Sequence, residues 1–195
     1  MKLYKLTDQN HRTRAGESNE CQWGENITHS GTGEGELCGP GWIHAYTDPL
    51  LAVMFNPIHA NIKSPILWES EGDVVLDDHG VKVGCLSLTT LRIVPLPEVS
   101  TNQLVAFGIL CAMQVYRDPK FLKWADGWLA GTDRSAYTAA AAAAAYPAAA
   151  AAYAAATAYT ATTYTATYAA YTAAAAAEVD CDLIGLARQA MEVLP

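Results

Sequence analysis

The residues best suited to chemistry lie at positions 39–49, which read GPGWIHAYTDP. Side chains of an extended chain alternate between two faces, so His44 and Tyr46 would share one face of a strand. An imidazole and a phenol presented together to a cleft can move protons or bind a polar ligand. The alternative interpretation is structural: Trp42, His44 and Tyr46 would then pack as a half-buried strand, because the sequence shows no partner for the imidazole.

Two neighbouring features would complete such a site. Asp48 and Pro49 are typical of a helix start, where aspartate accepts from free backbone N–H groups and proline occupies the first turn. The remaining N–H groups at such a start can hold an anion. Residues 8–41 are rich in Gly, Asn, Glu and Thr, and they predict a long loop that would cover the site.

The predicted ligand-binding set joins this strand to basic residues that could supply local positive charge. It comprises Trp42, His44, Tyr46, Arg12, Arg14 and Lys82. We predict no cofactor and no metal site, since the five histidines show no ligand spacing. The acidic run 73–79 lacks the regular spacing of a calcium loop and predicts a solvated hairpin turn.

Composition narrows the classes of partner and compartment. The chain of 195 residues has a formal net charge of −8 and no basic stripe, which argues against nucleic acid and anionic membranes as partners. No stretch is apolar enough to predict a membrane span. Five cysteines, none in a C-x-x-C pair, exclude a complete disulfide framework and offer no zinc signature. We expect a cytoplasmic protein.

The periodicities predict an α+β fold, with a small mixed β-sheet domain and packed helices, followed by an Ala/Thr/Tyr-rich helical tail. The expected strands span residues 2–7, 42–46, 66–71 and 81–94. The expected helices span residues 49–55, 101–116, a segment from 119 that ends at Gly131, and 178–195. The helix at 49–55 should stop at Asn56, because the residue before a proline is pushed out of the helical region.

Three segments follow from these elements. Residues 1–97 should form the β-rich domain, residues 98–135 a helical segment packed on it, and residues 136–195 an oligomerisation tail. The helix at 101–116 is apolar on nearly every face and should therefore be buried. Its expected core residues are Leu104, Phe107, Leu110 and Cys111.

The tail contains an unusual tract. Residues 136–177 comprise 26 Ala, 8 Thr, 7 Tyr and one Pro, with no charge. Alanine is the best helix former, so a helix is expected, with a kink or break at Pro147. A helix without charges has no solvated face, and we therefore expect it to pack against copies of itself or against the domain.

Several motifs resemble a bacteriophage and prophage family of unknown function. The resemblance rests on Tyr4-Lys5, Trp23-Gly24, the run GWIHAYTDP at 41–49, Leu67-Trp68-Glu69 with Gly72, and DDHGVKVGC at 77–85. It covers roughly residues 3–97 and implies a small β-rich N-terminal domain with an Ala-rich helical C-terminal region. It implies no particular activity, and the tail departs from the family by lacking Asp, Arg and Trp.

The order of elements is also similar to small ADP-ribosyltransferase-type folds, which hold NAD between two sheets. That resemblance would place Tyr4, His44 and Tyr46 in the pocket and make Glu69 the catalytic acid. The departure is that His44 and Tyr46 share one strand, whereas those enzymes place the histidine and tyrosine on separate strands.

Three hypotheses about function remain open. The favoured one is a phage-type accessory protein that binds and self-associates without catalysis, in one version as an oligomeric sponge for a small signalling nucleotide. The second is an ADP-ribosyltransferase-like enzyme that uses NAD. The third is a structural or assembly protein.

Overall fold

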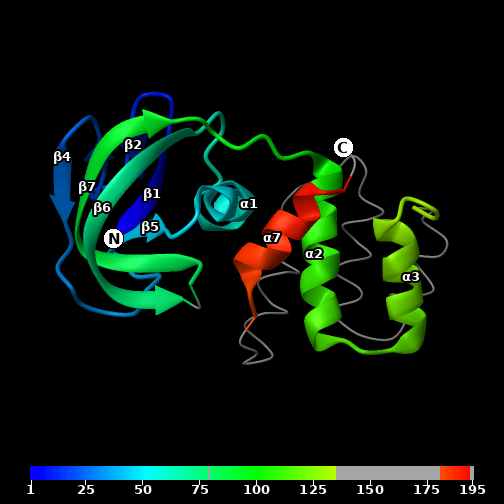
Figure 1. Ribbon diagram of the computed structural model, residues 1–195. Helices are drawn as coiled ribbons and strands as arrows, with labels where there is room; N and C mark the ends of the chain where they lie inside the picture. Colours follow the sequence, from blue (N-terminus) through cyan, green and yellow to red (C-terminus); the bar gives the residue numbers. More distant parts are fainter. Residues whose placement is uncertain (79, 135–180, 194–195) are drawn as a thin grey trace. The chain divides into compact units, whose positions relative to one another are not determined.

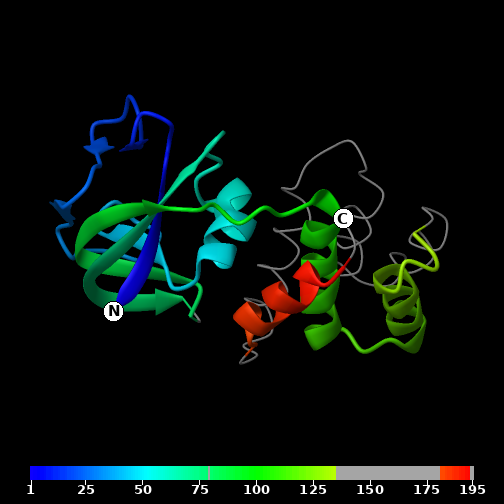
Figure 2. The same cartoon turned by 45° about the horizontal axis from the view of Figure 1, so that its top comes forward.

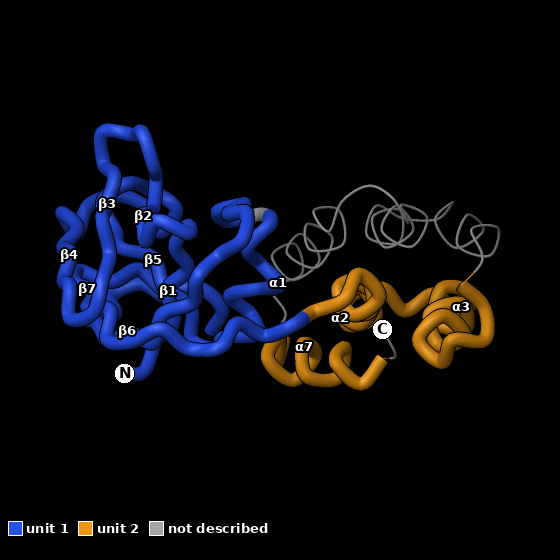
Figure 3. Tube along the Cα trace, turned by 90° about the horizontal axis from the view of Figure 1, so that it is seen from above, with its two compact units in different colours: residues 1–98 blue, residues 99–195 orange. Residues whose placement is uncertain are grey.

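The computed structural model describes residues 1–78, 80–134 and 181–193. The chain divides into two compact units, residues 1–98 and 99–195 (Figure 3). Together they form an α+β protein, which confirms the predicted class. The tract 136–177, and with it the predicted tail helix, lies outside the described residues.

The first unit contains seven strands and one helix. The strands are β1 (Lys2–Thr7), β2 (Arg12–Thr13), β3 (Cys21–Gln22), β4 (Ile27–Ser30), β5 (Ile43–Tyr46), β6 (Ile66–Asp78) and β7 (Lys82–Val94), and the helix is α1 (Pro49–His59). Five strands pair in the order β4-β7-β5-β1-β6, and β6 also pairs with β7. The pairings therefore close β1, β5, β7 and β6 into a ring. Within it, the long strands β6 and β7 are strongly curved (Figures 1 and 2).

Every strand pair among the described residues is antiparallel, so the expectation of a mixed sheet is wrong in that detail. Alternation along the strands separates the two faces of the ring. One face forms a core cluster, to which β1, β5 and β7 all contribute: Leu3, Trp23, Ala45, Val83, Cys85 and Leu88. The opposite face of β1 and β5 contacts α1, whose inner residues Leu51, Ala52, Met54 and Phe55 are fully buried.

Two boundaries differ from the sequence prediction for identifiable reasons. Helix α1 continues past Asn56 and includes Pro57, because the Asn56 side chain bonds both the N–H (3.1 Å) and the carbonyl (2.9 Å) of Ile62 and holds the last turn. Strand β6 continues through the acidic run to Asp78, because Val74 and Leu76 alternate with exposed residues and pair with β7. The turn is shorter than expected and includes Gly80 at φ 74°.

The segment 8–41 also differs from the predicted continuous loop. It contains the hairpin of β2 and β3, together with β4, which pairs with β7. The Trp23 indole, buried in the core cluster, donates to Thr13 Oγ1 at 2.9 Å and anchors this hairpin. The longest run of the segment outside these strands is residues 31–41, which form a loop.

The second unit contains α2 (Thr101–Val115), α3 (Pro119–Leu129) and α7 (Leu183–Met191). Helix α2 begins with a capping box in which Ser100 and Gln103 bond each other's backbone N–H groups. The Gln103 amide also donates to the carbonyls of Met191 and Val193 (3.1 and 3.4 Å), which links α2 to α7. The four expected core residues of α2, Leu104, Phe107, Leu110 and Cys111, are all buried.

Candidate functional site

Strand β5 presents its two polar aromatic residues on the face that the sequence predicted. Ile43 packs against the core cluster and Ala45 belongs to it, while His44 and Tyr46 face the other way. In the register with β7, His44 lies opposite Gly84 and Tyr46 opposite Lys82. The neighbouring strand therefore adds an ammonium group to the face that carries the imidazole and the phenol.

Tyr46 is covered by α1. It is 6% exposed, its ring stacks on His59 at 5.8 Å between centroids, and its hydroxyl hydrogen-bonds His59 Nδ1 at 3.1 Å. Burial raises the pKa of Tyr46 above its usual range and lowers the pKa of His59 to about 3. Tyr46 therefore acts as a packing residue, in agreement with the interpretation of this strand as structural and half-buried.

His44 lies under the loop at residues 31–41. Its Nε2 donates to the Leu37 carbonyl, and the neighbouring Trp42 indole donates to the Gly35 carbonyl at 2.9 Å. The ends of the loop meet where the Gly33 N–H donates to the Gly41 carbonyl at 2.9 Å. This is the closed geometry of an Ω-loop, folded back onto β5 and β7.

A glycine on β7 makes room for the loop. A Cβ atom on Gly84 would lie 2.8 Å from Leu37 Cδ1 and 3.3 Å from Trp42 Cγ. A side chain at position 84 would require the flexible Leu37 side chain to move and the Trp42 ring to shift by a few tenths of an ångström.

Three basic residues surround His44. Burial, chiefly, and the positive charges of Lys5, Lys82 and Arg14 together lower the pKa of His44 to about 4, against a bond to Leu37 that favours protonation. His44 is therefore neutral at pH 7. Its one N–H, on Nε2, already bonds the Leu37 carbonyl, so Nδ1 is left as an uncharged acceptor.

Lys5 approaches β5 from the side of the core cluster. Its Nζ donates to the His44 carbonyl at 2.7 Å and lies 5.2 Å from the centre of the Trp23 ring. Burial lowers the pKa of Lys5 to about 8, so the ammonium form still predominates at pH 7. The cation–π contact and the carbonyl bond offset part of the cost of burying this charge.

Lys82 lies on the same face as His44 and is 6% exposed. Its Nζ donates to Cys38 Sγ at 3.1 Å. Cys38 belongs to the 31–41 loop and is exposed. The loop therefore places an accessible thiol directly on a buried ammonium group.

The remaining predicted site residues lie elsewhere or are already paired. Arg12 forms ion pairs with Asp8 (3.6 Å) and Glu20 (3.8 Å) in the β2–β3 region. Arg14, next to it, has a left-handed backbone with φ 55° and forms no ion pair within the described residues. Arg14 therefore contributes to the positive potential at His44, whereas Arg12 is neutralised by its own hairpin.

The four residues of the transferase hypothesis do align on one face. Tyr4 lies opposite Tyr46 on β5 and opposite Glu69 on β6. Glu69, however, bonds Lys2 (2.9 Å) and Arg92 (3.0 Å), and the bond from Lys2 is the main cause that lowers its pKa. With Tyr46 buried and Glu69 paired, no free catalytic acid faces His44 in this set.

Within residues 1–78, 80–134 and 181–193, no group of three or more potential ligands could hold a metal ion. No helix of the described segments is long and apolar enough to span a bilayer. Asp73 accepts from Ser87 Oγ at 2.8 Å along β6 and β7, and His79 lies outside the described residues.

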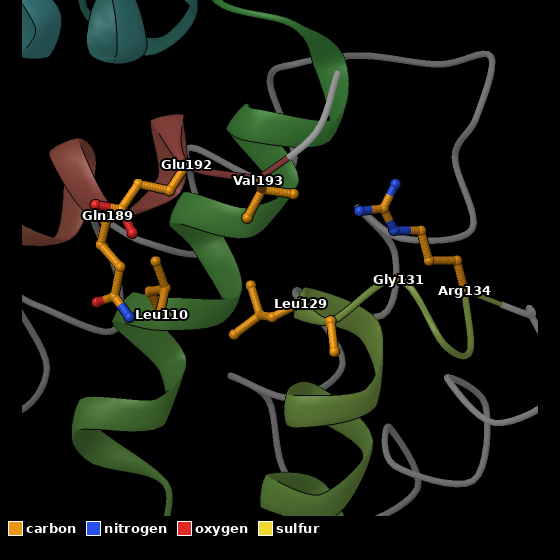
Figure 4. A pocket seen from close by; sticks show the side chains of 8 residues that line it. Leu110, Leu129, Gly131, Arg134, Gln189, Glu192 and Val193 are labelled. Atoms are coloured by element: carbon orange, nitrogen blue, oxygen red, sulfur yellow. The ribbon is translucent and has the colours of Figure 1, made fainter.

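The second unit contains a cavity of about 530 Å³ that the sequence did not predict. Figure 4 shows Leu110 of α2, Leu129 of α3 and Gln189 of α7 around it, with Arg134 at one side. The Arg134 guanidinium stacks over Trp128 at 4.7 Å, and its Nε donates to the Trp128 carbonyl at 3.2 Å. Arg134 is therefore engaged with α3.

The prediction missed three residues that shape the first unit's site: Lys5, Cys38 and His59. Lys5 carried a usable signal, because alternation puts it on the same face as Leu3 in β1. Cys38 and His59 carried none, since their partners Lys82 and Tyr46 are distant in sequence.

Comparisons with family models, with curated proteins and with solved structures found no match for this chain. The two family resemblances stay predictions.

Proposed function

We propose that the first unit is a non-enzymatic module that binds a small phosphate-bearing molecule, such as a nucleotide, over His44 and Lys82. The observation that supports this is the group of positive charges around His44. Lys5, Lys82 and Arg14 all act on its pKa, and none forms an ion pair with a carboxylate within the described residues. The chain as a whole carries a net charge of −8, so this concentration of cations opposes its overall composition.

The energetics favour an anion at Lys82. A buried ammonium needs strong acceptors, and a thiol is a weak one. A phosphate oxygen would form a charge-assisted bond, which is roughly twice as strong as a neutral one. Binding would move Cys38 off Nζ, which requires a shift of the 31–41 loop.

The composition and the contacts of the 31–41 loop favour such a shift. Five of its residues are glycines, and two of them, Gly33 and Gly35, adopt φ values of 77° and 85°. Most of its side chains are exposed, and its bonds to Trp42, His44 and Lys82 are single contacts. Such a loop can open without disturbing the strands beneath it.

The test is a thermal-shift series on the full chain with inorganic phosphate, pyrophosphate, mononucleotides and cyclic dinucleotides, each against matched chloride. A ligand at a hundred times its dissociation constant adds about 2.7 kcal/mol of stability. Lys82→Met should abolish the shift and Lys82→Arg should retain part of it. Lys63→Met, which changes an exposed lysine, should leave it intact.

Absence of any shift at millimolar phosphate compounds would refute the proposal. A shift that survives in Lys82→Met would refute the location. Binding should also weaken with added salt, because a charge-assisted contact near the surface is screened. Self-association through residues 136–177 is a separate part of the hypothesis and is tested separately below.

A further inference from the structure

We infer that Cys38 and Lys82 form a peroxide-sensitive pair in which oxidation of the thiol leads to a covalent S–N bond between loop and strand. This inference does not depend on phosphate binding. It rests on three observations: the 3.1 Å contact from Nζ to Sγ, the burial of Lys82 and the exposure of Cys38.

The contact places a positive charge beside the sulfur. Lys82 is 6% exposed, and Cys38 Sγ is the one acceptor recorded for its ammonium within the described residues. The thiolate is the nucleophile in cysteine oxidation, and negative charge on Sγ would lie directly against the Lys82 ammonium.

The other thiols provide the contrast. Cys85 and Cys111 are buried, and burial raises the pKa of both. Cys21 is partly exposed, and its Sγ donates to the Asn19 carbonyl at 3.7 Å, a bond that only the protonated thiol can make. Cys38 alone among these four combines exposure with a cation on sulfur.

The first step is oxidation by a hydroperoxide. The Cys38 thiolate attacks the outer peroxide oxygen, so an S–O bond forms as the O–O bond breaks. Sulfur loses two electrons, and the leaving alkoxide or hydroxide takes a proton from solvent. The products are Cys38 sulfenic acid and an alcohol, or water when the oxidant is hydrogen peroxide.

The second step uses the neighbouring amine. The Lys82 ammonium releases a proton and its nitrogen attacks the sulfenic sulfur, so that an S–N bond forms and water leaves. Sulfenic acids condense in this way with nearby nitrogen. No further oxidant is needed, and the product fastens the 31–41 loop to β7. A thiol reductant would reverse it.

The experiment treats the full chain with hydrogen peroxide at neutral pH and analyses tryptic peptides by mass spectrometry. The cross-link should join the peptide 15–63 to the peptide 64–92, with cleavage blocked at Lys82 and the mass lower by two hydrogen atoms. Dimedone added with the peroxide should trap sulfenic acid at Cys38 ahead of Cys21. Dithiothreitol added before digestion should restore cleavage at Lys82 and give the free peptides 15–63, 64–82 and 83–92.

Variants separate the two steps. Lys82→Met should slow alkylation of Cys38 by iodoacetamide, because it removes the cation that contacts the sulfur. Lys82→Arg keeps the positive charge, so it should keep the rapid alkylation but lose the cross-link. Circular dichroism of each variant checks that the protein is folded. If Lys82→Met does not fold, Lys82→Arg still tests whether the cross-link needs the lysine amine.

The outcomes are decisive in both directions. Cys38 reacting no faster than Cys21, or at the same rate in Lys82→Met, would overturn the activated thiol. Trapped sulfenic acid without any cross-linked peptide would overturn the S–N bond. If the full chain forms the cross-link but binds no phosphate compound, only the proposed function is refuted. The two conclusions are therefore distinguishable.

Discussion

Acid should destabilise the first unit through two buried histidines, His44 and His59. The pKa of His44 is lowered from 6.5 to about 4 and that of His59 from 6.5 to about 3, in both cases chiefly by burial. Between pH 6.5 and these values, the unfolded chain binds protons that the native state does not. Stability that is present above pH 6.5 must therefore be lost as the pH falls.

The size of the effect follows from proton linkage. Between pH 7 and pH 5, each histidine would lower the free energy of unfolding by about 1.8 kcal/mol if fully shielded from solvent. His44 is partly exposed, so screening reduces its share, and we expect a total of about 3 kcal/mol. Carboxylates contribute little above pH 5, because their unfolded pKa values lie near 4.

The assay is urea denaturation at pH 7, 6 and 5, followed by tryptophan fluorescence. Trp23, Trp42 and Trp68 report on the first unit. His44→Gln and His59→Gln should each remove part of the pH dependence, and the double variant should remove most of it. A wild-type stability that is flat from pH 7 to pH 5 would refute the reasoning. So would a double variant that keeps the full slope.

Three further predictions concern the second unit and the tail. Phe107→Ala, at a fully buried position of α2, should lower the free energy of unfolding by about 3–5 kcal/mol in urea; a loss below about 1 kcal/mol would mean that the site collapses around the smaller residue. Ser100→Ala should cost about 1 kcal/mol by removing one half of the capping box, and Ser100→Asp should restore most of it. Deleting residues 136–177 alone should lower the oligomeric state measured by light scattering while both units stay folded; a monomeric full-length chain would contradict this.

Signals that depend on neighbouring residues were readable from the sequence. Alternation identified β1 and β5, the Asp48-Pro49 pair identified the start of α1, and a run that is apolar on nearly every face identified the buried helix α2. Each signal is local, because a cap or a period is complete within a few residues. The α+β class follows from their order along the chain.

Local signals failed where tertiary contacts outweighed them. Pro57 predicted a helix end, but the Asn56 side chain holds another turn by bonding Ile62. The acidic composition of residues 73–78 predicted a turn, but pairing with β7 extends β6 through them. In both cases, bonds to residues outside the local window stabilise what local propensity disfavours.

The candidate site depended on tertiary structure to a greater degree. Alternation established that His44 and Tyr46 share a face, but not that α1 covers Tyr46 while a loop covers His44. The contact between Cys38 and Lys82 spans 44 residues, and that between Lys5 and the His44 carbonyl spans 39. Both arise because the closed ring of β1, β5, β7 and β6 brings distant strands into register. Sequence periodicity predicts the face on which a side chain lies, whereas only the tertiary structure determines which residues it contacts there.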